Sequence, residues 1–261
     1  MRKIYDCITF NDELDLLEIR LNTLDHVVDK FVIIESKKSW QNKLKPLFYL
    51  DNKERYAKFT DRIIHLTIPE ENFVDHTWTN EILTWNSIAA GILTADPNDL
   101  ICIGAVDEIP NPDTLEGLRD TLNEHAHLLQ GYYYYYMNTR FSESGTTDWC
   151  GTIVIPYAQL LKRENIYDAA IGDRMNKSRI KNGGWHFSYA GGVDQIYSKL
   201  QSFSHSEYNN IPKTDIEKQL NNLHDPFGRN YVAFQYIEPI ENLPVYVQQN
   251  QERFSKFIYK P

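Results

Sequence analysis

The amino-acid sequence predicts an α/β fold with a mostly parallel central sheet and helices on both of its faces. Short apolar runs of strand length alternate with longer segments of helical period, which is typical of a parallel sheet with covering helices. No stretch rich in Pro, Gly and Ser interrupts this alternation before residue 112. The expected strands of this part cover residues 3–10, 30–36, 61–68 and 99–104, and the expected helices cover 12–28 and 80–93.

The first expected strand, 3–10, is apolar throughout most of its length and leads directly into the first helix. Asp12 stands at the junction and is a suitable N-cap residue. Leucines then recur at steps of three and four residues, as they do along one face of a helix, at Leu14, Leu17, Leu21 and Leu24. The alternation of strand and helix continues through the other apolar runs of strand length and the helical segment 80–93.

Beyond Pro112 the pattern changes, and we expect an elaborated second half within a single domain that covers residues 1–261. A short helix is expected at 112–123. Two strand-like segments follow, at 131–139 and 149–157, and an aromatic segment at 183–192 is bracketed by glycines. Two further helices are expected at 193–203 and 214–223, and the tail from Pro239 is expected to wrap the surface.

Composition and charge restrict the possible functions. Apolar residues make up 42% of the 261 positions, which is ordinary for a globular protein with a sizeable core. The net charge of −9 argues against a non-specific nucleic-acid surface. The three cysteines are widely spaced and odd in number, which favours a reducing compartment. With no apolar signal region and no membrane-spanning run, we expect a cytoplasmic protein.

Polar residues follow the expected strands at their carboxyl ends, where open α/β sheets bind ligands. Asn11 and Glu13 follow the first strand, Glu35 ends the second, and Asp107 and Glu108 follow the fourth. If these strands are parallel, all of these side chains converge on one edge of the sheet. The alternative for Asn11 and Glu13 is a helix cap and a first-turn acid, which stabilise a helix without binding a ligand.

The adjacent carboxylates of Asp107 and Glu108 repel each other unless a cation or solvent relieves the repulsion. Mg²⁺ or Mn²⁺ would do so and would leave coordination positions open for a substrate. The alternative is a solvated turn that ends the strand before Pro110. Trp185 and His186, between two Gly-Gly pairs, are a second candidate site, in which His186 could complete a metal site or bind phosphate. A buried structural histidine is the alternative there.

Basic residues could neutralise a bound diphosphate, and Lys45 and Arg174 belong to two such clusters, at 36–46 and 174–181. A charged, solvated loop is the alternative for each. Arg20, on the first helix, is a further candidate for ligand binding, and Glu35 could bond a ribose hydroxyl. The sequence has no G-x-G-x-x-G motif after the first strand and no P-loop, which disfavours a dinucleotide or P-loop site.

Several segments together resemble glycosyltransferase family 17. They are FNDELDLLEIRLNTLDHVVDKFVIIES, KPLFY, VDEIP, GGWHFSYAGG and YSKLQS, and they occur in family order between about residue 4 and residue 203. The resemblance implies a GT-A type nucleotide-binding fold, a UDP-sugar donor with GlcNAc as the sugar, a glycan acceptor, Mn²⁺ or Mg²⁺, and inversion at the anomeric carbon. It also implies a nucleotide-sugar half at 1–112 and an acceptor half with the tail at 113–261.

The resemblance places the family's Asp-x-Asp-Glu-Ile-Pro motif on residues 105–110, with Ala105 in the first Asp position. This departure puts metal affinity and activity in doubt. The implied metal ligands are Asp107 and His186, and Glu108 is the leading candidate for the base. Other candidate bases are Asp148, Asp173 and Glu207. The donor-binding candidates are Asn11, Glu13, Arg20, Glu35, Lys45, Arg174 and Trp185. Because of Ala105, a protein that binds nucleotide sugars or glycans with little catalysis is the alternative.

Overall fold

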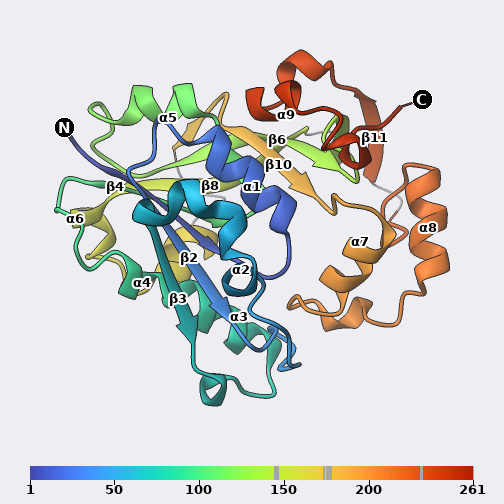
Figure 1. Cartoon of the computed structure of the whole chain (residues 1–261), viewed down its shortest axis with the longest axis horizontal. Helices are drawn as coiled ribbons and strands as arrows, with labels where there is room; N and C mark the ends of the chain where they lie inside the picture. The colour runs from blue at the N-terminus through green and yellow to red at the C-terminus, as the bar shows by residue number, and fades with distance from the viewer. Residues whose placement is uncertain (144–146, 173, 175–177, 230–231, 261) are drawn as a thin grey trace.

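The computed structural model describes residues 1–143, 147–172, 174, 178–229 and 232–260, and it confirms an α/β fold (Figure 1). The main path of the sheet has the strand order β11-β7-β6-β8-β4-β1-β2-β3, with β10 beside β5 and β6, and β9 beside β6. The strands are β1 (Ile4–Thr9), β2 (Lys30–Ser36), β3 (Ile63–Ile68), β4 (Leu100–Ala105), β5 (Glu108–Pro110), β6 (Ala126–Tyr134), β7 (Thr139–Glu143), β8 (Asp148–Pro156), β9 (Arg179–Ile180), β10 (Gly184–Ser188) and β11 (Val232–Ile237).

The α-helices are mostly short, and several differ from their expected lengths. The helix expected at 80–93 is divided into α3 and α4 around Ser87, whose hydroxyl donates to the carbonyl of Leu83 at 2.8 Å. Such local side-chain bonds compete with the helical pattern. The helices are α1 (Leu14–Thr23), α2 (Phe48–Asp51), α3 (Thr77–Asn86), α4 (Ile88–Gly91), α5 (Pro112–Leu118), α6 (Tyr157–Leu160), α7 (Val193–Leu200), α8 (Lys213–Asn221) and α9 (Val245–Gln249).

The mostly parallel sheet expected from the sequence is found in its N-terminal half, whereas the second half is mixed, with β9 and β10 parallel to β6 and its other pairs antiparallel. In the N-terminal half β1 pairs in parallel with β2 and β4, and β2 pairs in parallel with β3. β8 joins β4 antiparallel, and β6, β7 and β11 continue the sheet with antiparallel pairs. Parallel neighbours need a crossover long enough for a helix. Only residues 135–138 connect β6 to β7, so these strands form an antiparallel pair.

The central strand β1 divides the core into two layers, because successive side chains of a strand point to opposite faces. Ile4 and Ile8 pack into a cluster that includes residues of α1, α5 and α9. Tyr5 and Cys7 pack into a second cluster that includes residues of α3, α4 and α6. Helices therefore cover both faces of the sheet, as the sequence predicted, and the carboxyl ends of the parallel strands stay open at one edge.

A third, aromatic cluster places α7 beside that edge. Tyr132 and Tyr134 of β6 pack with apolar side chains of α7 and α8, such as Ile196 and Ile216. Tyr133 lies between them in the sequence and belongs to the cluster on the opposite face of the sheet. The tyrosine run therefore acts in packing, and its alternation fixes α7 against the second half of the sheet.

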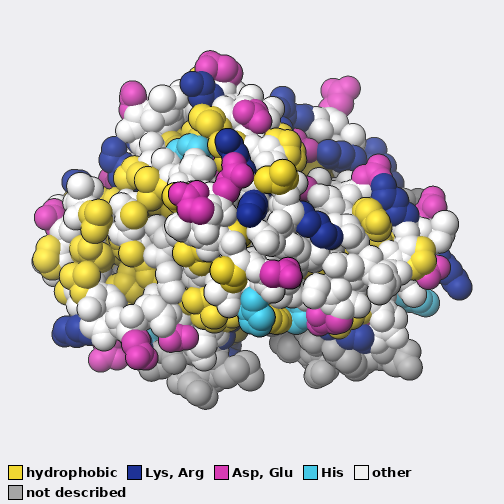
Figure 2. Space-filling model, turned by 90° about the horizontal axis from the view of Figure 1, so that it is seen from below, with side chains coloured by type: hydrophobic (Ala, Val, Ile, Leu, Met, Phe, Trp, Pro, Cys, Tyr) yellow, Lys and Arg dark blue, Asp and Glu magenta, His cyan; other side chains and the backbone are white. Residues whose placement is uncertain are grey.

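The surface carries charge of both signs. On the face shown in Figure 2, basic and acidic side chains are interspersed, and hydrophobic side chains gather on the side where α4 and α6 lie. Leu93, just after α4, and Leu161, just after α6, are among the exposed large hydrophobic residues. In the described parts of the chain, no helix is long and apolar enough to cross a membrane.

Candidate functional site

An open pocket lies beyond the carboxyl ends of β1, β2 and β4, where the sequence predicted a site. Residues from five separate segments line it: the turn after β1, the loop after β2, α3, the turn after β4 and the end of α7. Among the predicted residues, the lining includes Asn11, Glu13, Lys45, Ala105 and Asp107.

Short polar contacts join these segments around the pocket. The Asn11 side-chain amide donates to the Ser202 hydroxyl at 3.2 Å, and Lys45 Nζ donates to the Asn11 carbonyl at 3.4 Å. Asp12 was expected to cap the first helix, but Glu13 holds the N-cap position and makes no side-chain capping bond. Asp12 instead accepts from Gln195 at 2.7 Å and from Ser198 at 2.5 Å, and so ties the turn after β1 to α7.

Arg20, which is fully buried, holds the turn after β4 in place through hydrogen bonds. Its Nε and Nη2 donate to the two oxygens of Asp6, both at 2.7 Å. Its Nη1 donates to the carbonyls of Ala105 at 2.9 Å and Glu108 at 2.6 Å. The prediction that Arg20 binds a ligand is therefore corrected: it is a positioning residue, which fixes the backbone around Asp107 and has no surface free for a ligand.

Asp107 faces the pocket and forms an ion pair with Lys199 of α7. Lys199 Nζ lies 2.7 Å from Asp107 Oδ2, and His186 Nε2 lies 3.7 Å from the same oxygen. Burial alone would raise the pKa of Asp107, but Lys199 and His186 outweigh it and hold that pKa well below its usual range. Burial would lower the pKa of Lys199, but Asp107 and Glu13 raise it. Both members of the pair are therefore charged near neutral pH.

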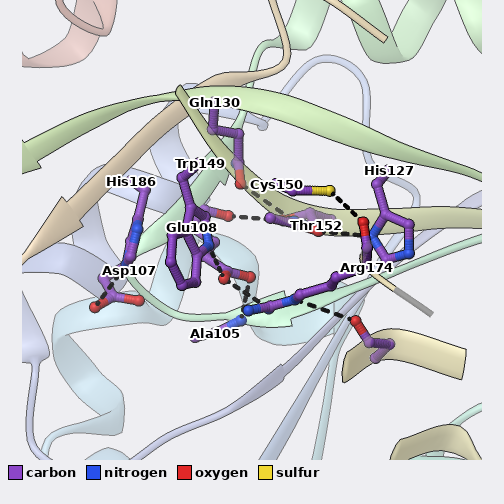
Figure 3. A network of polar contacts seen from close by, with 12 residues as sticks. Ala105, Asp107, Glu108, His127, Gln130, Trp149, Cys150, Thr152, Arg174 and His186 are labelled. Carbon is purple, nitrogen blue, oxygen red and sulfur yellow. Dashed lines mark hydrogen bonds and ion pairs between the residues drawn. The ribbon is translucent and has the colours of Figure 1, made fainter. Parts of the chain in front are cut away.

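Glu108 was the leading candidate for the base, and the structure gives it another role (Figure 3). Its carboxylate accepts from Trp149 Nε1 at 2.6 Å, from Arg174 Nη2 at 2.8 Å and from the Ala105 backbone N–H at 3.1 Å. The side chain is 2% exposed and does not line the pocket. Three donors and burial leave this carboxylate no access to a sugar hydroxyl, so Glu108 braces the turn instead.

Arg174 also stabilises this turn. Besides its bond to Glu108, its guanidinium lies 5.2 Å from the centre of the Trp149 ring, within the range of a cation–π contact. It does not line the pocket between β1 and β4. The expectation that Arg174 binds the donor diphosphate is therefore not supported by its position. Asp173, a candidate base, and Lys177, of the same basic cluster, lie outside the described residues.

The strand β10 carries Trp185 and His186 in opposite directions. His186 stacks on Tyr132 with ring centres 5.3 Å apart, and its Nδ1 is buried without a hydrogen-bond partner among the described residues. Trp185 donates from Nε1 to the carbonyl of Asn242 at 2.8 Å and packs against the core cluster of α1 and α9. Trp185 is therefore away from the pocket, whereas His186 supports Asp107.

Glu35 also lies outside the pocket, contrary to its predicted contact with a ribose. It is fully buried and accepts the backbone N–H groups of Tyr49 at 2.9 Å and Leu50 at 3.4 Å. These groups belong to the first turn of α2, where a negative charge is stabilising. His65 Nε2 approaches the same carboxylate at 3.2 Å. Glu35 thus anchors α2 to the sheet.

Glu13 is the predicted carboxylate of the pocket whose pKa is raised rather than lowered. Burial, and then the neighbouring charge of Asp12, raise the pKa of Glu13 to about 7, with Asp107 adding to the shift and Lys199 opposing it. The group is therefore only partly ionised near neutral pH.

Lys199 and Trp40 line the pocket and were not singled out from the sequence. Trp40 offers an indole face at the pocket while its Nε1 donates to Thr84 at 3.0 Å. The signal for Lys199 was weak: it is one lysine in an amphipathic helix, separated from Asp107 by 92 positions. No periodicity shows which face of that helix meets the strand ends.

The divalent cation expected at Asp107 and His186 does not fit the side chains present. Among the described residues, no group of three His, Cys, Asp or Glu side chains is placed to hold a metal ion. Ala105 offers no oxygen beyond its backbone, and Asp107 already accepts from Lys199. Mg²⁺ and Mn²⁺ favour several oxygen ligands, so a cation would have to displace Lys199 from its carboxylate.

The fold and the pocket define an α/β protein with a pocket beyond the carboxyl ends of parallel strands, the place where nucleotide-binding α/β folds hold their ligands. Within this class, the chain belongs to glycosyltransferase family 17, which matches residues 1–224. The family expected from the sequence motifs is therefore confirmed.

Two curated relatives are the proteins named beta-1,4-mannosyl-glycoprotein 4-beta-N-acetylglucosaminyltransferase from Homo sapiens and Rattus norvegicus, each 20% identical over 297 residues. The matches cover 100% of this chain and 56% and 55% of the relatives, so the chain spans about half of their length. A solved structure of 4-diphosphocytidyl-2C-methyl-D-erythritol synthase has a TM-score of 0.44 and 14% identity, with 77% of this chain and 98% of that chain covered.

Proposed function

We propose that the chain transfers N-acetylglucosamine from UDP-GlcNAc to a hydroxyl of a glycan, with inversion at the anomeric carbon. Membership of glycosyltransferase family 17 supports glycosyl transfer, and the names of its relatives support GlcNAc as the sugar. The observation that carries the proposal is the pocket beyond β1, β2 and β4, in which the ion pair of Asp107 and Lys199 meets the turn after β1.

In this proposal the pocket divides its contacts between the parts of the donor. The amide of Asn11 and the ring of Trp40, which both line the pocket, bind the uridine, because they offer a polar group and an aromatic surface. Lys199 also lines the pocket, beside Asp107, and receives the diphosphate as a point charge.

Inverting transfer needs a base on the face of the sugar opposite the leaving group. The bond from the acceptor oxygen to the anomeric carbon forms as the bond to the β-phosphate oxygen breaks, and the base takes the acceptor proton. Glu108 is too enclosed for this task. Asp148 and Glu207 are exposed carboxylates that pair with Arg140 at 2.8 Å and His205 at 2.7 Å, and neither lines the donor pocket.

A donor screen by thermal unfolding tests the proposal, with UDP-GlcNAc compared with GDP- and CMP-sugars in the presence and absence of Mn²⁺. UDP-GlcNAc at one hundred times its Kd should add about 2.7 kcal/mol to the free energy of unfolding. Ser202→Trp should remove this shift, because Ser202 lines the pocket. Ser255→Trp, at an exposed position, is the matched control and should keep it. Equal shifts with all donors, or none with UDP-GlcNAc, would contradict the proposal.

A second candidate function is a nucleotide-sugar or glycan-binding protein with little catalysis. Ala105 in the first Asp position of the family motif favours it, since one potential oxygen ligand is missing there. Release of UDP from UDP-GlcNAc, measured with and without candidate glycan acceptors, separates the two functions. Tight binding without any release of UDP, in the wild type and in Ala105→Asp, would favour the binding protein.

A further inference from the structure

The end of the sheet that faces the pocket presents few carboxylates that could hold a cation. Ala105 ends in a methyl group, and the carboxylate of Glu108 is held by Trp149 and Arg174 on the far side of the turn (Figure 3). Glu13 lines the pocket, but one of its oxygens accepts the backbone N–H of Asp12 at 3.1 Å. Asp107 is therefore the charged carboxylate at the end of β4, and Lys199 already neutralises it.

Lys199 is fixed where it can also reach a ligand. Its Nζ lies 2.7 Å from Asp107, its side chain is 26% exposed, and it lines the pocket. The helix α7 that carries it is anchored to the turn after β1 through the bonds of Gln195 and Ser198 to Asp12. An ammonium group has three donors, so one bond to Asp107 leaves donors for phosphate oxygens. The charge is thus placed before the ligand arrives.

We propose that the ammonium group of Lys199 supplies the positive charge that a divalent cation would supply at the donor diphosphate, so that UDP binds without a divalent metal. This inference rests on the proposed function, because it concerns the same pocket. Asp107 orients Lys199 through their ion pair. A metal ion at Asp107 would compete with Lys199 for one carboxylate, and two cations at that distance would repel each other.

Isothermal titration calorimetry with UDP, in EDTA and in MnCl₂, tests the inference on the wild type and on variants. The wild type should have the same Kd in both conditions. Lys199→Met should bind UDP roughly tenfold to a hundredfold more weakly in EDTA, as expected for the loss of a charged hydrogen bond. Lys199→Arg keeps the charge and should retain most of the affinity in EDTA. Lys213→Met, at an exposed lysine paired with Asp194, is the control and should match the wild type.

A double variant reverses the metal dependence. Ala105→Asp with Lys199→Met places two carboxylates at the end of β4 with no competing ammonium, so UDP binding should recover with MnCl₂ and be lost in EDTA. A wild type that loses tenfold or more in EDTA would overturn the inference, even if Lys199→Met does not fold. Binding in EDTA that Lys199→Met leaves unchanged would overturn it while the proposed function stands. No UDP binding in either condition would refute both.

Discussion

The buried arginine beneath the turn after β4 gives the sharpest prediction about how this site is built. Arg20 and Asp6 are 0% and 1% exposed, and the guanidinium also donates to the carbonyls of Ala105 and Glu108. Arg20→Met removes the guanidinium and leaves the Asp6 carboxylate buried without its cation. Breaking a buried ion pair in this way costs about 3–5 kcal/mol, because the remaining charge is not solvated.

A second variant separates the charge from the turn. Asp6→Leu combined with Arg20→Met removes the isolated carboxylate, and replacing a whole buried pair by apolar groups is often close to neutral. The carbonyl of Ala105 still loses the donor that Arg20 supplied, which costs about 1–3 kcal/mol, whereas the carbonyl of Glu108 keeps a bond from the Thr152 hydroxyl at 3.0 Å. The double variant should therefore be more stable than Arg20→Met alone, yet both should bind UDP weakly, because the backbone around Asp107 is no longer fixed.

Urea unfolding followed by circular dichroism measures the stability, and calorimetry with UDP measures the binding. An Arg20→Met variant within about 1 kcal/mol of the wild type would contradict the buried-pair estimate, since the loss of one partner should cost several times more. A double variant with wild-type affinity for UDP would show that Arg20 does not position the turn that carries Asp107.

Three further predictions concern Glu13, which lines the pocket, and the buried carboxylates of Glu108 and Glu35, which do not. The pKa of Glu13 is raised from 4.5 to about 7, so the folded state binds the extra proton and its stability should fall as the pH rises through that range. Glu13→Gln should flatten this loss of stability. It should also flatten the fall of UDP affinity above pH 7, which follows when Glu13, beside Asp12, Asp107 and Lys199, becomes charged. Urea unfolding and calorimetry at a series of pH values measure the two effects, and parallel curves for the wild type and the variant would contradict the prediction. Glu108→Gln should lower the free energy of unfolding by about 1.5–3 kcal/mol, because its bond to Arg174 is weakened. The pH profile of UDP-GlcNAc hydrolysis should keep its shape. If the variant loses the acidic or the basic side of that profile, Glu108 is the base after all. Glu35→Gln should lower the free energy of unfolding by about 1 kcal/mol, because it weakens the hydrogen bonds that anchor α2. UDP affinity should stay unchanged, and a tenfold loss of UDP affinity would show that Glu35 belongs to the nucleotide site.

The N-terminal half of the fold could be predicted from the sequence because three of its strands, β1, β2 and β4, are buried on both faces. Such strands are continuous apolar runs, and the run at 30–36 coincides with β2 (Lys30–Ser36). The convergence of Asn11, Glu13 and Asp107 followed from one rule, that parallel strands carry their carboxyl ends to the same edge. Local sequence and this rule were enough to locate the pocket.

The roles that could not be predicted depend on contacts between distant segments. Arg20 sits on the face of α1 that meets Asp6 and the turn after β4, and helical periodicity does not say that this contact exists. Glu35 does end its strand, but α2 arrives at the same point and takes its carboxylate. The pairing of Lys199 with Asp107 depends on how α7 docks against the tyrosines of β6, which is a property of the packed aromatic cluster.

The central claim is that the pocket beyond β1, β2 and β4 holds a UDP-sugar with its diphosphate at Lys199. A crystal structure of the protein grown with UDP-GlcNAc in EDTA tests it most directly. We expect the uracil beside Asn11 and Trp40, and a phosphate oxygen within hydrogen-bond distance of Lys199 Nζ. A nucleotide bound elsewhere on the molecule, or a diphosphate in this pocket that makes no contact with Lys199, would contradict the account.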